Sequence, residues 1–414
     1  MNPTLGLSLF LAGLLTTEGL LKPSFSDQNH ETLDRSQERK GRMAAKELAK
    51  RNMAFGFKLL KKMASVNSHK NIFFSPLSIS TAFSLMCLGA QDDTLAEIKQ
   101  GFNFRKMSDK DLHEGFHYLI RKVNQETQGV KVKLGNTLFM DKKLQPQREF
   151  LRDAKNLYYA DTVPTNFQNM ENARQQINDY ISEKTHGKIN NLVKNIDSGT
   201  VMLLTNYMFF RAKWQNEFDP KLTKEEAFIL ERNNSVKVPM MFHGGMYQVG
   251  RDDQLSCTIL EIPYLKNITA TFILPDEGKM KHLEEALEEN IFAKWKPLML
   301  HRVVDVSVPK LHITGTHDLK RTLSHLGITR IFEEHGDLSR ISPHRSLKVG
   351  EAVHEAELKM DEKGTEGAAG SGAQTLPMET PMPVKINRPY ILVVHETLTP
   401  SILFLGKIVN PTSK

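Results

Sequence analysis

The chain of 414 residues is poor in the residues and motifs that would cross-link a fold or carry out catalysis. It has two cysteines, Cys87 and Cys257, and both lie in apolar runs, which favours two buried free thiols over the alternative of one disulfide. It has no nucleophile elbow, phosphate-binding glycine loop or dinucleotide fingerprint. We therefore predict that packing stabilises the fold, and that the protein is neither an enzyme nor dependent on a cofactor.

Long apolar runs are also missing, except at residues 5–15 near the amino terminus. This run has the length of a secretory signal and is followed by a small-residue flank, although the positively charged start of a typical signal is absent. The alternative is an uncleaved anchor, but the run is too short to span a bilayer comfortably. We predict a signal peptide at residues 1–20 and a secreted, extracellular protein.

Acidic residues are fewer than basic ones, with 48 Asp and Glu against 55 Lys and Arg, so the formal net charge is +7. Loss of the signal peptide would remove Glu18 and no base, which raises the charge to +8. A basic secreted protein meets polyanions, so we expect a glycosaminoglycan or an anionic membrane surface as a partner, and no nucleic acid. Two sequons, at Asn233 and Asn267, are candidate glycosylation sites on the surface.

Helical patterns dominate the first part of the chain. Residues 21–42 are polar with little periodicity and predict a mobile amino-terminal tail, and the first helix is predicted at 44–63. Ser75 and Pro76 suit the cap and first turn of the second helix. The helices after the first are predicted at 76–88, 94–101, 109–124 and 169–184.

Strand patterns dominate the later part. Residues 130–134 alternate with period two, so Lys131 and Lys133 share one face while the apolar residues between them face a core. Other strands are predicted at 201–214, 255–263, 268–274, 303–311, 352–360, 390–395 and 402–409. Helices first and strands later predict an α+β fold rather than alternating βαβ units.

Residues 113–117, His-Glu-Gly-Phe-His, match the zinc-protease pattern of two histidines one helical turn apart with a glutamate between them. The usual contexts for a third ligand are absent, and Gly115 weakens the helix that would hold the other two. With 15 histidines in the chain, such a match arises by chance. We predict a surface helix here and no metal site.

Residues 362–383 fit neither a core strand nor a stable helix. The first part, 364–373, consists almost entirely of Gly, Ala, Ser and Thr, so it can be flexible in one state and still enter a crowded sheet. Three prolines in the second part favour extended backbone, so Met378 and Glu379 are presented in the conformation in which a protease binds a substrate. We predict an exposed tether that contains a protease-sensitive bond.

Four segments resemble serpin segments, in the same order and across nearly the whole chain. They are Asn-Ile-Phe-Phe-Ser-Pro-Leu-Ser-Ile at 71–79, Asn-Tyr-Met-Phe-Phe-Arg-Ala-Lys-Trp at 206–214, Asp-Glu-Lys-Gly-Thr-Glu at 361–366 and Phe-Leu-Gly-Lys-Ile-Val-Asn-Pro at 404–411. The resemblance implies one serpin domain at 43–414, with an α+β serpin fold of three β-sheets, eight or nine helices and an exposed reactive-centre loop at about 362–383. Within the family the chain resembles the secreted clade A members, including an adipokine with an insulin-sensitising, metabolic role.

The resemblance implies that the protein is a suicide substrate. A serine protease attacks the Met378 carbonyl and frees Glu379, and the preceding loop inserts into the central sheet A, which traps the acyl-enzyme. Small hinge residues make insertion fast, and the hinge positions are Glu362, Gly364, Thr365, Gly367, Ala368 and Ala369. Gly367 stands where Ala is more usual, and further glycines follow, so slow insertion with some substrate-like turnover is a hazard.

The resemblance also assigns residues that control the opening of sheet A. They are Ser75, Ser78, Asn206 and His354 in the family's shutter, and Trp214 in the breach where insertion begins. Ordinary buried hydrogen bonding is the alternative interpretation, and both can hold together.

The reactive bond indicates the target. Met378 suits a chymotrypsin-like protease, such as a tissue kallikrein, and Glu379 requires that its active-site rim tolerate an acid. The alternative is a non-inhibitory serpin that carries a hormone or binds a receptor, and the small-residue hinge argues against it. A chaperone retained in the endoplasmic reticulum does not fit, because residues 410–414 lack a retrieval signal. We expect a monomer.

Basic residues predicted on several strands give a hypothesis for polyanion binding on the outer face of sheet A, with heparin or a related glycosaminoglycan as an accelerator of inhibition. These residues are Lys131, Lys133, Lys188, Arg211, Lys213 and Lys359. The alternative is that lysines on the open face of a strand serve only solvation.

Overall fold

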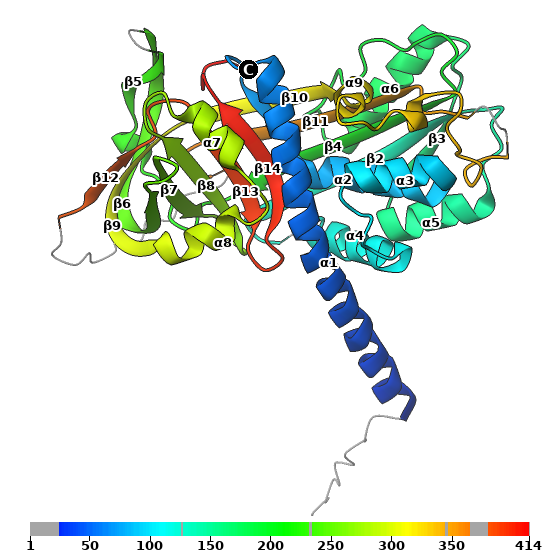
Figure 1. Ribbon diagram of the computed structural model, residues 1–414, viewed down its shortest axis with the longest axis horizontal. Helices are drawn as coiled ribbons and strands as arrows, with labels where there is room; N and C mark the ends of the chain where they lie inside the picture. The colour runs from blue at the N-terminus through cyan, green and yellow to red at the C-terminus, as the bar shows by residue number, and fades with distance from the viewer. Residues whose placement is uncertain (1–24, 126, 232–233, 344–346, 365–379, 414) are drawn as a thin grey trace, which may run out of the picture. The chain divides into compact units, whose positions relative to one another are not determined.

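The computed structural model describes residues 25–125, 127–231, 234–343, 347–364 and 380–413 (Figure 1). The chain divides into two units, Met1–Lys40 and Gly41–Lys414. Helix α1 spans Phe25–Val66, so it begins well before the predicted start at 44 and replaces much of the mobile tail predicted at 21–42. Neither Gly nor Pro occurs between Phe25 and Lys40, and the many Glu, Gln, Lys and Arg residues favour a helix without an apolar stripe.

The described residues contain nine α-helices, within the predicted eight or nine. After α1 they are α2 (Pro76–Gly89), α3 (Asp92–Gly101), α4 (Asp109–Val123), α5 (Arg148–Tyr158), α6 (Met170–Lys184), α7 (Met280–Ala286), α8 (Ile291–Trp295) and α9 (Leu319–Ser324). Ser75 caps α2 as predicted, because its side chain accepts a hydrogen bond from the Ser78 backbone N–H at 3.1 Å. Nearly every residue of α2 is buried, so this helix lies in the core.

A five-stranded sheet, called sheet A below, has the strand order β10-β11-β4-β2-β3. The strands are β2 (Val130–Asp141), β3 (Asp161–Thr165), β4 (Met202–Ala212), β10 (Leu311–Asp318) and β11 (Glu351–Met360). Burial alternates along the start of β2, with Lys131 and Lys133 on the more open face as predicted. Helix α6 covers part of that face, where Ile177 and Ile181 pack with Leu203 and Tyr207.

A nine-stranded sheet holds the remaining strands of the described residues. They are β1 (Ile72–Phe74), β5 (Lys224–Glu231), β6 (Asn234–Asp252), β7 (Cys257–Pro263), β8 (Ile268–Pro275), β9 (Leu300–Pro309), β12 (Met382–Lys385), β13 (Tyr390–Glu396) and β14 (Ser401–Ile408). Strand β6 pairs with β5, β7 and β9 along its 19 residues. The serpin resemblance implied three sheets, and the continuous β6 helps to join two of them by hydrogen bonds into one.

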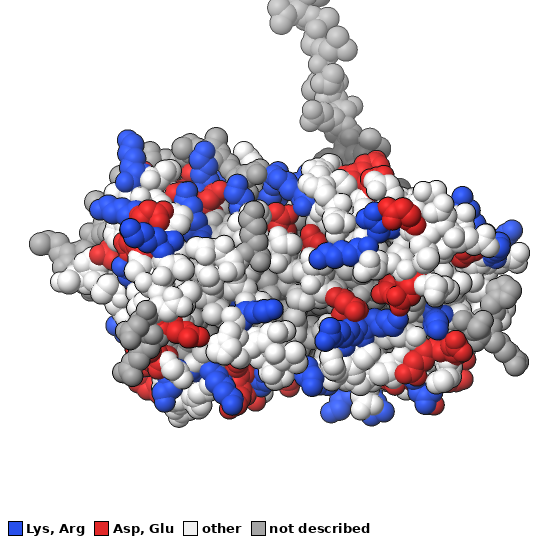
Figure 2. All heavy atoms as spheres, turned by 90° about the horizontal axis from the view of Figure 1, so that it is seen from above, with Lys and Arg blue, Asp and Glu red and all other residues white. Residues whose placement is uncertain are grey.

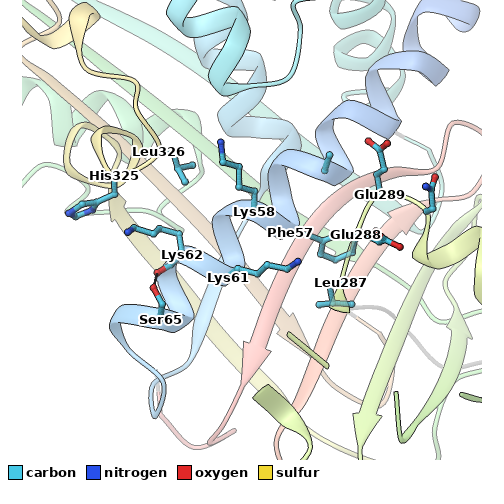
Figure 3. A pocket seen from close by; sticks show the side chains of 12 residues that line it. Phe57, Lys58, Lys61, Lys62, Ser65, Leu287, Glu288, Glu289, His325 and Leu326 are labelled. Carbon is cyan, nitrogen blue, oxygen red and sulfur yellow. Dashed lines mark hydrogen bonds between the residues drawn. The ribbon is translucent and has the colours of Figure 1, made fainter. Parts of the chain in front are cut away.

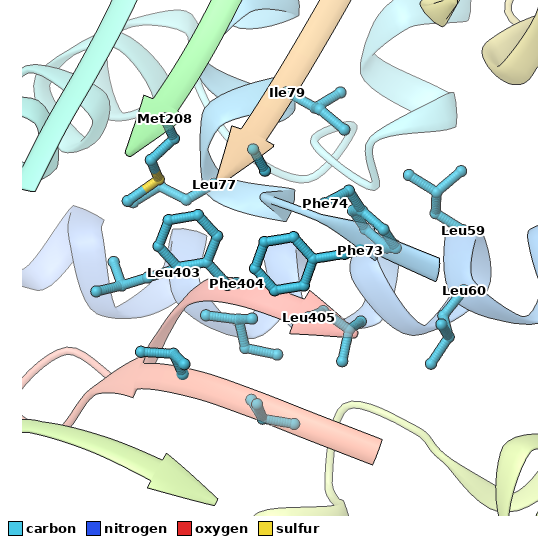
Figure 4. Close-up of a cluster of buried hydrophobic side chains, with 14 of the residues drawn as sticks. Leu59, Leu60, Phe73, Phe74, Leu77, Ile79, Met208, Leu403, Phe404 and Leu405 are labelled. Atoms are coloured by element: carbon cyan, nitrogen blue, oxygen red, sulfur yellow. The ribbon is translucent and has the colours of Figure 1, made fainter. Parts of the chain in front are cut away.

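The main core lies where the two sheets meet α1 and α2 (Figure 4). Phe73 of β1 stacks on Phe404 of β14 with ring centroids 5.4 Å apart, and Met208 of sheet A belongs to the same cluster. Cys87 and Cys257 are both free and buried, as predicted. Packing rather than a disulfide therefore joins the two sheets.

Candidate functional site

The centre of sheet A is a parallel pair of strands, β4 and β11, called the seam below. Its eight register pairs run from Leu203 opposite Glu351 to Phe210 opposite Leu358. On the other side of each strand the neighbour is antiparallel, β2 for β4 and β10 for β11. Parallel ladders are slightly less stable per residue than antiparallel ones, so the seam is a natural place for the sheet to part.

A buried polar cluster, called the shutter cluster, holds the seam to α2. It consists of Ser75, Ser78, Asn206 and His354. Asn206 and His354 are register partners across the seam, and His354 Nδ1 lies 2.6 Å from Asn206 Oδ1. Asn206 Oδ1 also accepts from Ser78 Oγ at 2.9 Å, and the Ser75 backbone N–H donates to His354 Nε2 at 3.0 Å. The structure therefore brings these four predicted residues together.

The hydrogen bonds of the shutter cluster fix the state of the His354 ring. Nε2 accepts a hydrogen bond and an amide oxygen can only accept, so the proton lies on Nδ1 and the ring is neutral. Complete burial lowers the pKa of His354 well below its ordinary value, and nearby His317 lowers it further. The neutral ring joins α2 to both strands of the seam.

Asn136 on β2 is a member of this network that sequence reasoning missed. It is the register partner of Asn206, and Asn206 Nδ2 donates to Asn136 Oδ1 at 2.7 Å. A single amide within the otherwise apolar end of β2 is the signal that could have identified it.

A tight turn, called the hinge turn, occupies the end of the seam beyond Met360 and consists of residues 361–364. The Asp361 N–H donates to the Gly364 carbonyl at 2.8 Å, and the Gly364 N–H returns a bond of 3.0 Å. Gly364 also forms an antiparallel bridge with Lys213, just past the end of β4. The chain has therefore already reversed direction between the ends of the two seam strands.

Only glycine fits at position 364. Its φ of +107° disfavours any other residue, and a Cβ would lie 2.2 Å from the Ala212 carbonyl oxygen and 2.6 Å from the Trp214 nitrogen. Both close contacts are with backbone, which does not move aside as a flexible side chain would.

Side chains around the hinge turn hold it in place. Trp214, 1% exposed, stacks on Tyr264 at 3.9 Å and donates from Nε1 to the Asp361 carbonyl at 2.8 Å. Glu362, 7% exposed, pairs with Lys310 at 2.7 Å and accepts from Thr223 Oγ1 at 2.7 Å. Burial raises the pKa of Glu362, but these two hydrogen bonds, a backbone hydrogen bond and the charge of Lys310 together outweigh it and lower the pKa below its ordinary value.

The ends of the predicted tether are thus structured, which corrects its boundaries. At one end Glu362 and Gly364 are buried, and at the other Pro383 lies in β12, opposite Asp305 of β9. The composition of residues 362–383 indicated small side chains and prolines, but it could not indicate which distant residues contact the two ends. The remaining predicted loop residues lie outside the described residues, namely Thr365, Gly367, Ala368, Ala369, Met378 and Glu379.

Glu351 begins β11 at the opposite end of the seam. Lys320 Nζ lies 4.0 Å from Glu351 Oε1 and 3.5 Å from Asp197 Oδ2. Burial first, and a hydrogen bond to Asp197 second, raise the pKa of Glu351 to about 7. This carboxyl therefore changes its charge near neutral pH.

Glu351→Gln is expected to remove a pH-dependent loss of stability. Because the folded pKa of about 7 exceeds the ordinary 4.5, folding favours the protonated carboxyl, and its contribution is full below pH 4.5 and lost as pH rises through 7. Between pH 4.5 and 8 the variant should gain about 1–2 kcal/mol relative to the wild type, after allowance for solvent screening. Denaturant unfolding across this pH range measures the difference.

The matched control is Glu357→Gln, on the same strand and with a side chain 18% exposed against 16% for Glu351. A difference between wild type and Glu351→Gln that does not change with pH would contradict the expectation.

The predicted polyanion residues lie on or near the open face of sheet A. Lys131 and Arg211 are register partners on β2 and β4, Lys133 lies two residues along β2, and Lys359 lies on β11 beside them. Lys213 follows β4, and Lys188 lies in the turn after α6, which packs on this face. On the face drawn in Figure 2, Lys and Arg are interspersed with Asp and Glu, so basic side chains do not form an unbroken surface there.

The two histidines of the zinc-protease pattern lie on α4 and contact different tyrosines at the end of α5. His113 Nδ1 lies 2.5 Å from the Tyr158 hydroxyl, and burial lowers the pKa of His113 to about 4. The His117 ring stacks on Tyr159 with centroids 5.5 Å apart. No group of three potential ligands that could hold a metal occurs among the described residues.

The remaining predictions concern the surface and the membrane. Asn267 is exposed in the turn between β7 and β8, whereas Asn233 lies outside the described residues. Within the described ranges, no helix has both the length and the apolar character needed to cross a bilayer.

Curated relatives match along the whole chain. Serpin A12 (vaspin) of Homo sapiens is 70% identical over 414 residues, which is 100% of both chains. Serpin A12 of Rattus norvegicus is 62% identical and covers 99% of this chain and 100% of its own. Alpha-1-antitrypsin of Meriones unguiculatus is 41% identical, covering 97% of this chain and 98% of its own.

Two solved structures illustrate how closely the fold is shared. Human thyroxine-binding globulin in complex with thyroxine has a TM-score of 0.84 at 36% identity, covering 89% of this chain and all of its own. Human kallistatin has a TM-score of 0.84 at 35% identity, covering 90% and 100%. The family model described as serpin, serine protease inhibitor, matches residues 50–411. The fold, the relatives and this match together show that the chain belongs to the serpin family.

Proposed function

We propose that the protein inhibits a chymotrypsin-like serine protease by inserting its cleaved loop into the seam. The observation that carries this proposal is the hinge turn, where Gly364 already bridges Lys213 in antiparallel fashion at the mouth of the seam. A strand that continued from Gly364 would run antiparallel to both β4 and β11. It would replace one parallel ladder with two antiparallel ladders, which is a net gain of hydrogen bonds.

The length of the loop fits this movement. Fourteen residues, 364–377, precede the Met378 carbonyl, and at about 3.3 Å per residue they span roughly 46 Å as a strand. A protease bound covalently to Met378 would be carried that far from the hinge turn. Distortion of its active site during this movement would stop hydrolysis of the acyl-enzyme.

The target proposal rests on the reactive bond. Met378 favours a chymotrypsin-like protease, such as a tissue kallikrein, whose pocket accepts a long unbranched apolar side chain, and Glu379 favours a target with a basic rim beside its active site. We propose secretion and action as a monomer. The insulin-sensitising adipokine role that the resemblance implied stays a prediction.

A panel of chymotrypsin-like proteases tests inhibition. We expect a covalent complex on a denaturing gel with at least one of them, and a large gain in heat stability after cleavage at Met378-Glu379. Cleavage without any complex and without that gain would favour the second candidate, a non-inhibitory carrier. The solved thyroxine-binding globulin complex is the observation that keeps this candidate open.

Heparin binding tests the polyanion proposal. Arg211→Ala combined with Lys359→Ala is expected to lower the slope of log affinity against log salt by about 1.5–2, because two charge contacts are lost. Heparin-column elution and titration at several salt concentrations measure the change. Lys224→Ala with Lys237→Ala removes the same charge from exposed positions on β5 and β6, and equal effects of the two pairs would argue against a site on sheet A.

A further inference from the structure

The surface also has a pocket whose lining includes none of the seam residues. We call it the α1–α7 pocket, because it lies between the end of α1, helix α7, the end of β5 and the segments that flank β13 and β14. Its volume is about 900 Å³. Sites for small molecules commonly measure about 300–1,000 Å³, so the pocket has the size of a ligand site.

Apolar residues from six parts of the chain line the α1–α7 pocket. They are Ala64, Ile229, Leu230, Pro275, Met280, Pro389 and Val409. Ile229 is 43% exposed, which is a large fraction for an isoleucine. A ligand that covered these side chains would remove apolar surface from water, which is the main driving force for binding apolar molecules.

The pocket also contains a buried acceptor. Glu284 is 9% exposed, and its Oε1 lies 2.5 Å from Nζ of Lys407, which is 3% exposed. Lys407 Nζ also donates to the Ser68 carbonyl at 2.8 Å. Apart from this ion-pair contact, Oε1 receives no hydrogen bond among the described residues, so it is the acceptor to which a ligand hydroxyl or amine can donate.

Each cationic side chain around the rim of the pocket has a polar or acidic partner. His69 lies 3.3 Å from Glu231, Lys281 lies 4.0 Å from Glu285, and Arg388 lies 4.0 Å from Asp276. Lys61 donates to the Glu285 carbonyl at 2.9 Å. Because every cationic side chain on the rim has an acceptor or acid beside it, the rim offers no excess positive charge to attract an anionic ligand.

A neighbouring hollow shows the contrast (Figure 3). There Lys58, Lys61 and Lys62 of α1 line a groove, with Lys61 pointing toward the side of Glu288 and Lys62 toward the side of His325. That groove has four apolar residues in its lining, Ala54, Phe57, Leu287 and Leu326, against the seven of the α1–α7 pocket, so it offers less to an apolar ligand.

We propose that the α1–α7 pocket binds a neutral amphipathic small molecule. Its apolar body, of the size of two or three fused rings, packs against Ile229, Met280 and Pro389, and one hydroxyl or amine donates to Glu284. The lining includes no residue of sheet A or of the hinge turn, so this binding does not depend on the proposed inhibition.

1-Aminoanthracene, a neutral three-ring amine that fluoresces in apolar surroundings, tests the proposal with the full-length protein. We expect saturable binding of one molecule per chain. Ile229→Lys, which places a charged chain in the pocket, should raise Kd by about tenfold or more, equivalent to at least 1.4 kcal/mol. Leu222→Lys is the matched control, since Leu222 is 44% exposed and lies outside the lining, and it should leave Kd unchanged.

A second variant tests the acceptor. Glu284→Gln leaves the shape of the pocket and should weaken binding of the amine severalfold, while thermal unfolding verifies that the chain still folds. Absence of saturable binding, or an equal change in Kd for Ile229→Lys and Leu222→Lys, would overturn the proposal. Tighter binding of the anionic probe 8-anilinonaphthalene-1-sulfonate than of the neutral amine would overturn the ligand class.

Discussion

Gly364→Val is expected to turn the protein from an inhibitor into a substrate of its target protease. A Cβ at this position would lie 2.2 Å from the Ala212 carbonyl oxygen, so the hinge turn must leave the mouth of the seam. Insertion would then begin later, and the acyl-enzyme would have time to hydrolyse. Titration of the protease should show that the number of inhibitor molecules consumed per complex rises by about tenfold, the effect of about 1.4 kcal/mol on competing rates.

Gly327→Val is the control for backbone strain alone. Gly327 has a φ of +83°, and nothing lies within 4 Å of its Cβ position. The control should lose stability but keep its yield of covalent complex. Equal yields for Gly364→Val and the wild type would show that the hinge turn does not govern insertion.

Asn206→Ala is expected to loosen the seam. Asn206 is fully buried and binds His354, Ser78 and Asn136, so its removal leaves several buried polar groups without partners. The free energy of unfolding should fall by about 3 kcal/mol. The unpaired edges of β4 and β11 would then be available for strand addition from other chains, so we also expect association on warming. Denaturant unfolding and size-exclusion chromatography measure the two effects.

Asn178→Ala separates loss of stability from opening of the seam. Asn178 is 5% exposed, and its side chain makes two bonds of 2.9 Å to the backbone of Val193, away from β11. This variant should unfold more easily without forming larger species on warming. Association of both variants to the same extent would show that general instability, not the seam, causes it.

Local patterns predicted much of the fold because they reflect local physics. The period of two at the start of β2 gave the correct open face for Lys131 and Lys133, and the Ser75 cap gave the start of α2. The start of α1 was predicted wrongly, because residues 25–43 form a helix through propensity without the apolar stripe that marks one. The 19-residue β6 was not predicted as one strand.

Contacts between distant residues could not be predicted from local patterns. Lys310 and Glu362 are 52 positions apart, and no periodicity links them. The resemblance named Asn206 and His354, but only the parallel register places them opposite each other across the seam. The buried hinge turn was also hidden, because three charged residues followed by a glycine, at 361–364, have the composition of an exposed turn.

A reversible disulfide across the seam tests most directly the claim that inhibition requires the cleaved loop to insert between β4 and β11. Thr205 and Val353 are register partners on β4 and β11, so cysteines at both positions can form a disulfide across the seam. The native thiols will not compete, because burial raises the pKa of Cys87 and of Cys257 to about 12. Single-cysteine variants control for each substitution.

The measurement is the yield of covalent protease complex from the Thr205→Cys, Val353→Cys protein before and after reduction. We predict that the oxidised protein is cleaved at Met378-Glu379 without forming a complex or gaining heat stability. Reduction should restore both the covalent complex and the gain in heat stability. A covalent complex formed in equal yield by the oxidised and the reduced protein would contradict insertion into the seam as the mechanism.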